Sequence, residues 1–373
     1  NLVITCHELN LYLKNKFWGK RDEKLILPLN DSVSGTLSTD QMHAKTTVMR
    51  CKDFTEDKIW LNGKYHINFA SNLVTPLISV RRLSRESGTS EDIVNTKVHI
   101  CSENNFPTAA GLASSAAGYA CLVFALKELF GVKQDITRVA RLGSGSACRS
   151  IYGGFVRWHK GDLADGSDSI ATQIASPSHW PLHVFILVVS KNHSFVVSNS
   201  VTSELVQYRI KESVPKRIED IIQAIKERNF EKFAEITMKD SNQFHAVCLD
   251  TYPPNIYMND ISHEITSFVH TYNELFPKLK VAYTFDAGPN ACIYLEEESV
   301  PDFAATLQYI FPPEETLESY FKGESVQVFV LIHNNPRPFE VYHPYQIGDG
   351  PKRLDSSEDH LLTLSGVPVK NEP

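Results

Sequence analysis

The chain has 373 residues, of which 42% are hydrophobic, and its formal net charge at pH 7 is −7. This length suits two domains or one large two-lobed domain, and the hydrophobic fraction is that of a globular protein with a sizeable core. The acidic balance argues against a nucleic-acid-binding protein, because such proteins need a basic surface that meets the phosphates.

The cysteines and the apolar segments indicate in which cellular compartment the protein is expected. The seven cysteines are scattered, odd in number and without CxxC spacing, which favours a reducing environment over a disulfide framework or a zinc site. The longest apolar run, residues 184–189, is too short to span a bilayer. The sequence shows neither a signal-peptide pattern at its start nor a peroxisomal address at its end. We therefore expect a cytoplasmic protein without a membrane span.

The first segment that could carry chemistry is Lys16-Phe17-Trp18-Gly19-Lys20-Arg21-Asp22. It places three cations within six positions beside a flexible glycine, and such a cluster in an acidic protein could clamp a phosphate or a carboxylate. A solvated basic turn explains the same residues, and charge alone favours the turn.

The stretch Pro107–Ala117 is the most informative one in the chain. Residues 97–101 before it alternate as a strand does, and residues 116–130 behind it predict a helix that ends at Gly131. A loop of small residues that leads into a helix N-terminus presents N–H groups and the positive end of the helix dipole to an anion. It is not a Walker A loop, since Leu112-Ala113-Ser114 stands where Lys and Ser or Thr are needed. An Ala-rich helix whose small residues only permit close packing is an equally good interpretation.

A second loop of small hydroxyl residues, Gly143-Ser144-Gly145-Ser146-Ala147-Cys148-Arg149, ends in an arginine. The planar guanidinium of Arg149 can bind a carboxylate through two parallel hydrogen bonds. The alternative is a flexible linker that leads to Gly153-Gly154. We favour a functional loop, because a linker does not need an arginine between Cys and Ser.

Glycine is absent from residues 167–287, which marks a change of composition near residue 181. Within and just after that stretch the patterns predict a strand at 184–190, helices at 215–229, 230–238 and 262–275, and strands at 281–285 and 291–295. Asp286 lies in the tight loop between the last two strands, where it could be a general base or a carboxylate that orients a hydroxyl, although the local pattern alone favours a simple turn residue. His245 could pass for a base, but a hydrogen-bonded histidine on a helix packing face explains it better.

These elements predict an α+β chain whose lobes cover residues 1–181 and 182–373. The Gly, Pro and Asp content of residues 344–373 is typical of a loosely packed tail.

Taken together, these segments resemble one family. Pro107–Ala117 is similar to the phosphate motif of the GHMP small-molecule kinases. Its combination with Trp18–Asp22, Asn104–Pro107, Gly143–Arg149 and Thr284–Asn290 resembles the eukaryotic mevalonate diphosphate decarboxylases. The resemblance runs from Lys16 to about Phe311. It implies a GHMP-kinase-like two-lobed fold, with an N-terminal lobe like ribosomal protein S5 and a C-terminal ferredoxin-like α/β sandwich lobe.

The resemblance also implies a reaction: ATP and 5-diphosphomevalonate give isopentenyl diphosphate, carbon dioxide, ADP and phosphate, as a step of isoprenoid and sterol synthesis. The γ-phosphoryl group passes to the 3-hydroxyl, phosphate leaves, and loss of the carboxylate quenches the positive charge that develops at C3. The resemblance further implies that the protein is a homodimer and that it requires Mg²⁺. The ion is expected to bind through the ATP phosphates, with Ser115 the one candidate ligand from the protein.

Residue by residue, the resemblance implies catalytic roles for Asp286, Arg149, Ser115 and Lys16. Asp286 would accept or orient the hydroxyl proton, and Arg149 would hold the substrate carboxylate. The nucleotide would be bound by residues around the phosphate motif: Asn104, Pro107, Gly111, Leu112, Ala113, Ser114 and Ser115. The substrate would be contacted by residues from three segments: Phe17, Trp18, Lys20, Ser144, Ser146, Arg149 and Asp286.

Three departures from the family pattern lie on the substrate side. Leu11 stands where the family has a substrate-contacting Asn, and the neighbouring Asn10 would face the opposite side of a strand. The segment Lys191–Phe195 is shorter than the family's Gly/Ser/Thr-rich loop, and Phe17 replaces the usual Tyr. Two alternatives therefore stay open, namely a GHMP-type kinase that does not decarboxylate and a decarboxylase-like protein with lost or reduced turnover.

Overall fold

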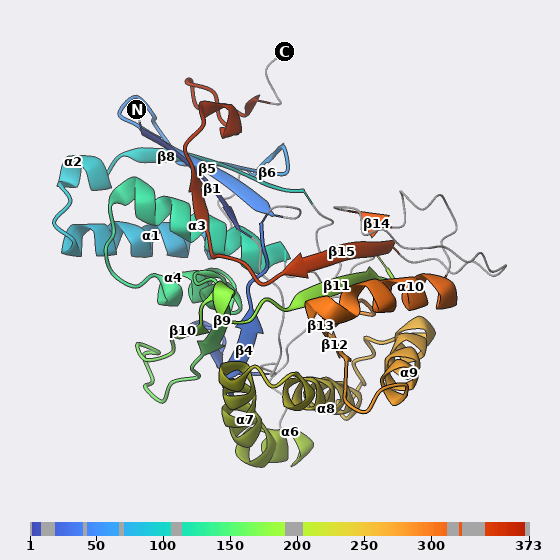
Figure 1. Ribbon diagram of the computed structural model, residues 1–373. Helices are drawn as coiled ribbons and strands as arrows, with labels where there is room; N and C mark the ends of the chain where they lie inside the picture. Colours follow the sequence, from blue (N-terminus) through green and yellow to red (C-terminus); the bar gives the residue numbers. More distant parts are fainter. Residues whose placement is uncertain are drawn as a thin grey trace.

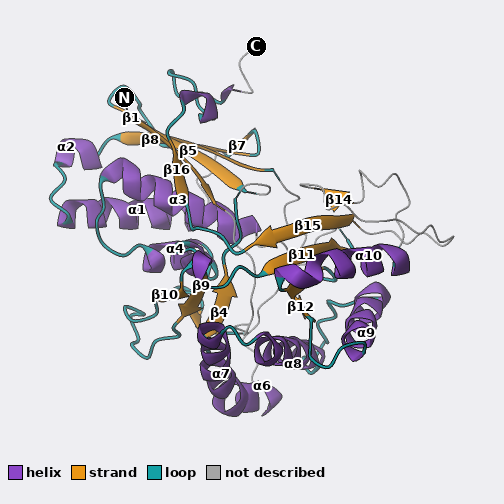
Figure 2. Cartoon of the chain, viewed as in Figure 1, coloured by secondary structure: helices purple, strands orange, loops and turns teal. Residues whose placement is uncertain are grey.

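The computed structural model describes residues 2–8, 19–39, 43–66, 71–105, 114–190, 204–311, 321–322 and 340–369. Figure 1 shows two sheets with helices packed on them, one built mainly from the first half of the chain and the other from the second half. Both halves contain helices and strands, which follow one another in runs rather than in strict alternation, so the predicted α+β class is confirmed (Figure 2).

The N-terminal lobe is built on a six-stranded sheet in the order β16-β1-β5-β8-β6-β7. Its strands are β1 (Leu2–Glu8), β5 (Ala44–Cys51), β6 (Lys58–Leu61), β7 (Lys64–Tyr65), β8 (Lys97–Asn104) and β16 (Lys352–Leu354). The helices of this lobe are α1 (Ser71–Glu86), α2 (Glu91–Val94), α3 (Ser114–Phe130), α4 (Thr137–Gly143) and α5 (Ala147–Ser150).

The predicted strand and helix on either side of the phosphate motif are both confirmed, as β8 and α3. Helix α3 packs on β1 and β5 with Ala116, Ala117 and Ala120 fully buried. Their small side chains let the helix approach the sheet closely, and the Cys121 thiol donates a hydrogen bond to the Cys6 carbonyl at 3.1 Å. Close packing thus accounts for the alanines of α3, while the residues that precede the helix, 106–113, lie outside the described residues.

Two smaller sheets are formed by further strands of the first half of the chain. A three-stranded sheet has the order β10-β9-β4, and β2 pairs with β3 in a hairpin. These strands are β2 (Lys20–Asp22), β3 (Leu27–Pro28), β4 (Ser32–Gly35), β9 (Phe155–Trp158) and β10 (Ala171–Ala175).

The C-terminal lobe contains a five-stranded sheet in the order β12-β13-β11-β15-β14, in which only β14 and β15 run parallel. The strands are β11 (His183–Val188), β12 (Val281–Phe285), β13 (Ala291–Leu295), β14 (Phe321–Lys322) and β15 (Glu340–Gln346). The helices are α6 (Glu204–Tyr208), a π-helical turn (Arg209–Ser213), α7 (Val214–Glu227), α8 (Phe230–Leu249), α9 (Asp260–Glu274) and α10 (Val300–Ile310).

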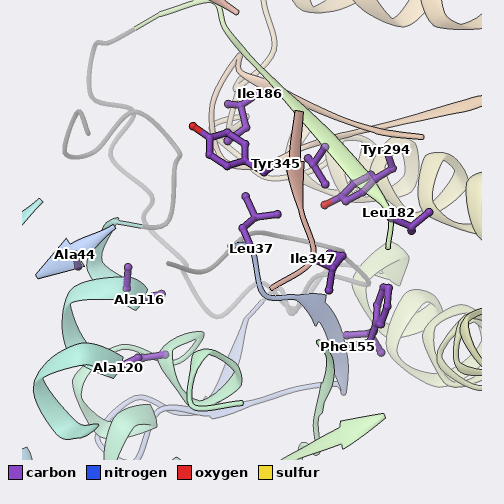
Figure 3. Packing of buried hydrophobic residues seen from close by; sticks show 14 of the residues in the cluster. Leu37, Ala44, Ala116, Ala120, Phe155, Leu182, Ile186, Tyr294, Tyr345 and Ile347 are labelled. Carbon is purple, nitrogen blue, oxygen red and sulfur yellow. The ribbon is translucent and has the colours of Figure 1, made fainter. Parts of the chain in front are cut away.

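One hydrophobic core runs through both lobes, and Figure 3 shows the part where they meet. Leu37 forms an antiparallel bridge with Ile347, whose N–H group donates to the Leu182 carbonyl at 3.2 Å. The backbones there approach so closely that a Cβ on Gly348 would lie 2.4 Å from the Cα of Ser38. This junction fixes one lobe against the other.

The prediction of a loosely packed tail is wrong for residues 352–369. Strand β16 pairs with β1, and Leu362 is buried against the outer side of the N-terminal sheet. The Gly366 carbonyl lies 2.7 Å from Nδ1 of His99. The glycines that suggested looseness instead permit close approach, since a Cβ on Gly366 would lie 2.4 Å from the ring of Phe54.

Candidate active site

The exposed side chain of Ser115 stands at the N-terminus of α3. Its hydroxyl oxygen lies 3.4 Å from the hydroxyl oxygen of Ser144, which is half-buried just after α4. Two residues predicted from separate segments are therefore brought together. The first turn of α3 also directs its N–H groups to this place, which makes it suited to an anion.

Gly143, the last residue of α4, explains why Ser144 can approach Ser115. A Cβ at this position would lie 2.3 Å from the Tyr119 ring of α3, so any larger residue would push α4 and α3 apart. Ser144 then leaves the helix in an extended conformation, with its N–H bonded to the Ala140 carbonyl at 3.1 Å. The glycine thus allows the contact between the two serine hydroxyls.

Arg149 lies on the short helix α5, so the prediction of a loop that runs to Arg149 is wrong at its end. The residue is 2% exposed, and its guanidinium donates from Nη1 to Oγ of Ser32 at 2.6 Å and lies 5.7 Å from the centre of the Trp158 ring. These contacts set the plane of the guanidinium, which a bidentate carboxylate partner requires.

Ser146 and Cys148 belong to the same segment. The Ser146 carbonyl accepts the Arg149 N–H at 3.1 Å, which starts α5, and the Ser146 side chain is half-buried. Burial raises the pKa of the Cys148 thiol to about 12, against the opposing effect of Arg149 and Arg141. Cys148 is therefore a neutral packing residue near neutral pH and not a nucleophile.

The tight loop that carries Asp286 joins β12 and β13, as predicted. The Gly288 N–H donates to the Asp286 carbonyl at 2.8 Å and closes the turn. Asn290 fixes the other end, because its Oδ1 accepts from the N–H groups of Val189 and Ser190 at 2.8 and 3.0 Å. This loop is therefore attached to the end of β11, and Asp286 is held half-buried at its start.

The negative charge of Asp286 contributes to the raised pKa values of two buried tyrosines, Tyr257 and Tyr294. Burial, with smaller contributions from Cys248 and Asp286, raises the pKa of Tyr257 to about 12. Burial also raises the pKa of Tyr294, with Cys292 and Asp286 acting in the same direction. Both phenols stay protonated at neutral pH, so Asp286 has neutral neighbours on this side.

Lys20 and Asn104 are also placed. Lys20 is half-buried in the hairpin strand β2, opposite Pro28. Asn104 ends β8, and its N–H donates to Oδ1 of Asn62 at 3.0 Å. The binding roles of Lys20 and Asn104 stay predictions.

Arg21, the neighbour of Lys20, does not share a phosphate clamp with it. Its guanidinium donates to the carbonyls of Lys160, Gly161 and Leu163 at 3.2–3.3 Å. The cations of the basic segment therefore do not all act together, because Arg21 binds the carbonyls of the turn at residues 160–163.

Several predicted site residues lie outside the described residues, as do the positions where the sequence departs from the family pattern. The former are Lys16, Phe17, Trp18, Pro107, Gly111, Leu112 and Ala113. The latter are Asn10, Leu11 and the segment 191–195. Ser114 is the first residue of α3.

The donor atoms near Ser115 fit a magnesium ion that is held through phosphates. In the part of the chain that is described, no three His, Cys, Asp or Glu side chains gather so that they could hold a metal ion. Hydroxyls and helix N–H groups are what the site offers, and Mg²⁺ commonly keeps its waters and takes substrate phosphates with only one or two protein ligands.

Sequence reasoning missed three supporting residues. Ser32 binds Arg149, Tyr119 limits the residue at position 143, and Asn290 ties the Asp286 loop to β11. Only Asn290 carried a signal, because Asn after Gly-Pro in a tight loop suggests side-chain bonds to nearby backbone. Ser32 and Tyr119 come from distant segments, and no local pattern reveals such pairs.

Comparison with known families decides the assignment. Residues 14–171 match the diphosphomevalonate decarboxylase-like N-terminal domain, and residues 184–349 match the mevalonate 5-diphosphate decarboxylase C-terminal domain. The chain belongs to the diphosphomevalonate decarboxylase family. The family predicted from the sequence is confirmed, and so is the GHMP-kinase-like fold.

Individual members of the diphosphomevalonate decarboxylase family match over nearly the whole length. The diphosphomevalonate decarboxylase of Danio rerio is 49% identical over 99% of this chain and 97% of its own. The mevalonate diphosphate decarboxylase of Trypanosoma brucei superposes with a TM-score of 0.87 at 36% identity, covering 97% of this chain and 100% of that one.

A further structure, MDDEF in complex with MVAPP, AMPPCP and magnesium, has a TM-score of 0.74 at 28% identity and covers 95% of this chain and 99% of that one. A family member thus binds a nucleotide analogue and magnesium together. None of the helices among the described residues of our chain has the length and apolar character needed to cross a membrane.

Proposed function

We propose that this chain catalyses the ATP-dependent decarboxylation of (R)-5-diphosphomevalonate to isopentenyl diphosphate, carbon dioxide, ADP and phosphate. The observation that carries the proposal is the contact between Ser115 and Ser144, at 3.4 Å. It joins the helix N-terminus that suits nucleotide phosphates to the segment that bears Arg149. Phosphoryl donor and substrate carboxylate would therefore be bound by neighbouring parts of one site.

Asp286 would act on the 3-hydroxyl of the substrate. Its carboxylate accepts the hydroxyl proton or orients the oxygen for attack on the γ-phosphorus, which forms the new O–P bond and breaks the bond to ADP. The turn closed by Gly288 and the attachment through Asn290 support this role, because they fix the backbone on which the carboxylate stands. Enzymes catalyse phosphoryl transfer mainly by positioning the reactants and by stabilising the charge of the transition state.

Arg149 favours decarboxylation over simple kinase chemistry. A kinase that stops after phosphoryl transfer has no use for a guanidinium that holds a carboxylate. In the proposed second step the C3–O bond breaks with loss of phosphate, and the C–C bond electrons of the departing carboxylate form the double bond. Arg149 holds the carboxylate in line with that breaking bond, and Ser32 and Trp158 fix its plane.

Lys16, Lys20 and the serines complete the proposed site. Lys16 would stand near the reacting groups, Lys20 near the substrate diphosphate together with Phe17 and Trp18, and Ser144 and Ser146 would contact the substrate. Asn104 and residues 107–115 would bind the nucleotide, with Mg²⁺ on its phosphates and Ser115 as the candidate protein ligand. The ion would neutralise phosphate charge.

We further propose a homodimer in the cytoplasm, with lobes divided near residue 181, except that residues 352–369 return to the N-terminal sheet. The scattered cysteines support a reducing compartment, and six of the seven are buried. Light scattering coupled to gel filtration tests the dimer, since a mass of one 42.0 kDa chain would contradict it.

The experiment that tests the function is a coupled product assay. Purified protein is incubated with magnesium, ATP and 5-diphosphomevalonate, and isopentenyl diphosphate and ADP are quantified. Formation of both supports the proposal. ADP with a phosphorylated six-carbon product would identify a kinase, and no product would identify a protein that has lost turnover.

A further inference from the structure

Helix α8 carries polar residues in its middle that are buried where a helix usually packs with apolar ones. Ser241 is 1% exposed and His245 is 8% exposed. Buried polar side chains cost free energy unless they are hydrogen-bonded, so their partners show what they do. The sequence alone suggested only that His245 is a hydrogen-bonded packing residue, and the structure confirms this.

Both side chains bind the main chain of one residue, Phe285. The Phe285 N–H donates to Oγ of Ser241 at 3.0 Å, and the Phe285 carbonyl lies 3.3 Å from Nε2 of His245. Because a carbonyl only accepts, Nε2 carries the hydrogen in this contact. Strand β12 is at the edge of its sheet, so these groups would otherwise lack a strand partner.

Phe285 directly precedes Asp286, which makes its carbonyl important. The peptide bond is planar, so the Phe285 carbonyl and the Asp286 N–H lie in one plane. A hydrogen bond that orients the carbonyl therefore orients the backbone from which the Asp286 side chain extends. On the other side, the bond from the Gly288 N–H to the Asp286 carbonyl fixes the next peptide.

Helix α8 is itself anchored next to these residues. Asp240 is fully buried and accepts two hydrogen bonds from Arg209, at 2.7 and 2.9 Å, and one from Arg217 at 3.0 Å. The Phe285 ring is also fully buried, with the rings of His245 and Tyr283 packed around it. The support for Asp286 is therefore rigid from the helix to the strand.

We propose that Ser241 and His245 are positioning residues, which hold the main-chain N–H and carbonyl of Phe285 so that the Asp286 carboxylate meets the 3-hydroxyl of the substrate. The inference rests on the proposed function. A carboxylate displaced by about 1 Å loses on the order of 100-fold in rate, although the fold and the binding of substrates are kept. The expected signature is a fall in kcat without a matching change in KM.

Asn242 offers a matched control on the same helix. Its Oδ1 accepts a hydrogen bond at 2.9 Å from the hydroxyl of Tyr283, which is also in β12 but two residues before Phe285. Asn242→Ala thus removes a bond between α8 and β12 without removing a bond to the main chain of Phe285. A merely structural role for the polar face of α8 would make this variant as slow as the others.

The test measures kcat and KM for ATP and 5-diphosphomevalonate in five full-length variants. Ser241→Ala and His245→Phe should lower kcat about 10- to 100-fold with both KM values within about three-fold of wild type. Ser241→Thr keeps a hydroxyl that can accept from the Phe285 N–H, and His245→Gln keeps an N–H donor for the Phe285 carbonyl. Both variants should therefore recover most of the rate. Asn242→Ala should stay within about three-fold of wild type.

Each outcome bears on the inference. Wild-type kcat in Ser241→Ala and His245→Phe overturns it, and so does an equal loss in Asn242→Ala. If His245→Phe does not fold, the comparison of Ser241→Ala with Ser241→Thr decides alone. A wild-type protein that forms no carbon dioxide contradicts the proposed function itself, whereas an active wild type with unaffected variants contradicts only the positioning role.

Discussion

The hydroxyl oxygens of Ser115 and Ser144 lie 3.4 Å apart, although 29 positions separate the two residues in the sequence. The first stands at the N-terminus of α3 and the second just beyond α4. Gly143 permits the contact, because a side chain there would meet the ring of Tyr119. The place where a phosphoryl group would be bound is thus joined to the segment that leads to Arg149.

Replacing Gly143 should break this contact. In Gly143→Ala the new methyl group would lie 2.3 Å from the Tyr119 ring, so α3 and α4 must separate. We expect a loss of about 1–3 kcal/mol in the free energy of unfolding, measured by urea denaturation, together with a lower rate. Gly118→Ala on α3 is the control, since among the described residues no atom outside the backbone of its own helix lies within 4 Å of the added Cβ. That variant should be unchanged or slightly more stable.

Asp286→Asn should lower turnover by orders of magnitude and leave ATP binding near the wild-type value. The amide keeps the shape of the side chain but cannot accept the hydroxyl proton, and this affects the transition state rather than the ground state. Steady-state rates and nucleotide titration by calorimetry check both halves. An equal loss of nucleotide affinity would contradict the role given to Asp286.

Arg149→Lys should lower kcat by about 10- to 100-fold, because lysine keeps the charge but lacks the planar fork. It cannot bind Ser32 and a substrate carboxylate in one plane as the guanidinium does. Arg138→Lys on α4 is the matched control, since Arg138 is bonded to the exposed Asp165 carbonyl. Wild-type rates in Arg149→Lys would remove Arg149 from the mechanism.

Stability should fall as the pH drops below about 6.5, the ordinary pKa of histidine. Burial lowers the pKa of His99 in the folded protein, and burial does the same for His159, His183 and His360. Below pH 6.5 the unfolded chain therefore binds protons that the folded chain does not, which favours unfolding.

Urea denaturation at pH 7.5, 6.5 and 5.5 measures this dependence. His99 is the clearest contributor, because its ring stacks on Phe54 with centroids 3.6 Å apart and Nδ1 contacts the Gly366 carbonyl. His99→Gln should be less stable at every pH and show a shallower decline. A wild-type stability that is flat from pH 7.5 to 5.5 would contradict the sign of these shifts.

Elements with a clear periodicity could be predicted from the sequence. The strands at 281–285 and 291–295 were predicted with the bounds that β12 and β13 have, and the stripe of isoleucines from Ile218 to Ile225 marked α7. Helix α8 was predicted to end at residue 238 but continues to Leu249. Its second half holds buried polar residues, which hide the apolar pattern on which such predictions depend.

The site could be predicted as a set of segments but not as an arrangement. Ser115, Ser144 and Arg149 each stood out through residue type, and the family resemblance supplied their roles. The tail was misjudged because Gly366 and its neighbours look flexible in sequence, whereas a glycine also permits a close contact. Long-range partners such as Ser32 for Arg149 depend on the folded backbone and leave no local signal.

The ratio of carbon dioxide to ADP in one reaction tests the proposed decarboxylation most directly. Substrate labelled at the carboxylate carbon is mixed with excess ATP and magnesium, and both products are counted over the first turnovers. An enzyme that decarboxylates its phosphorylated intermediate forms one carbon dioxide for each ADP. ADP formed without carbon dioxide would contradict the proposed decarboxylation.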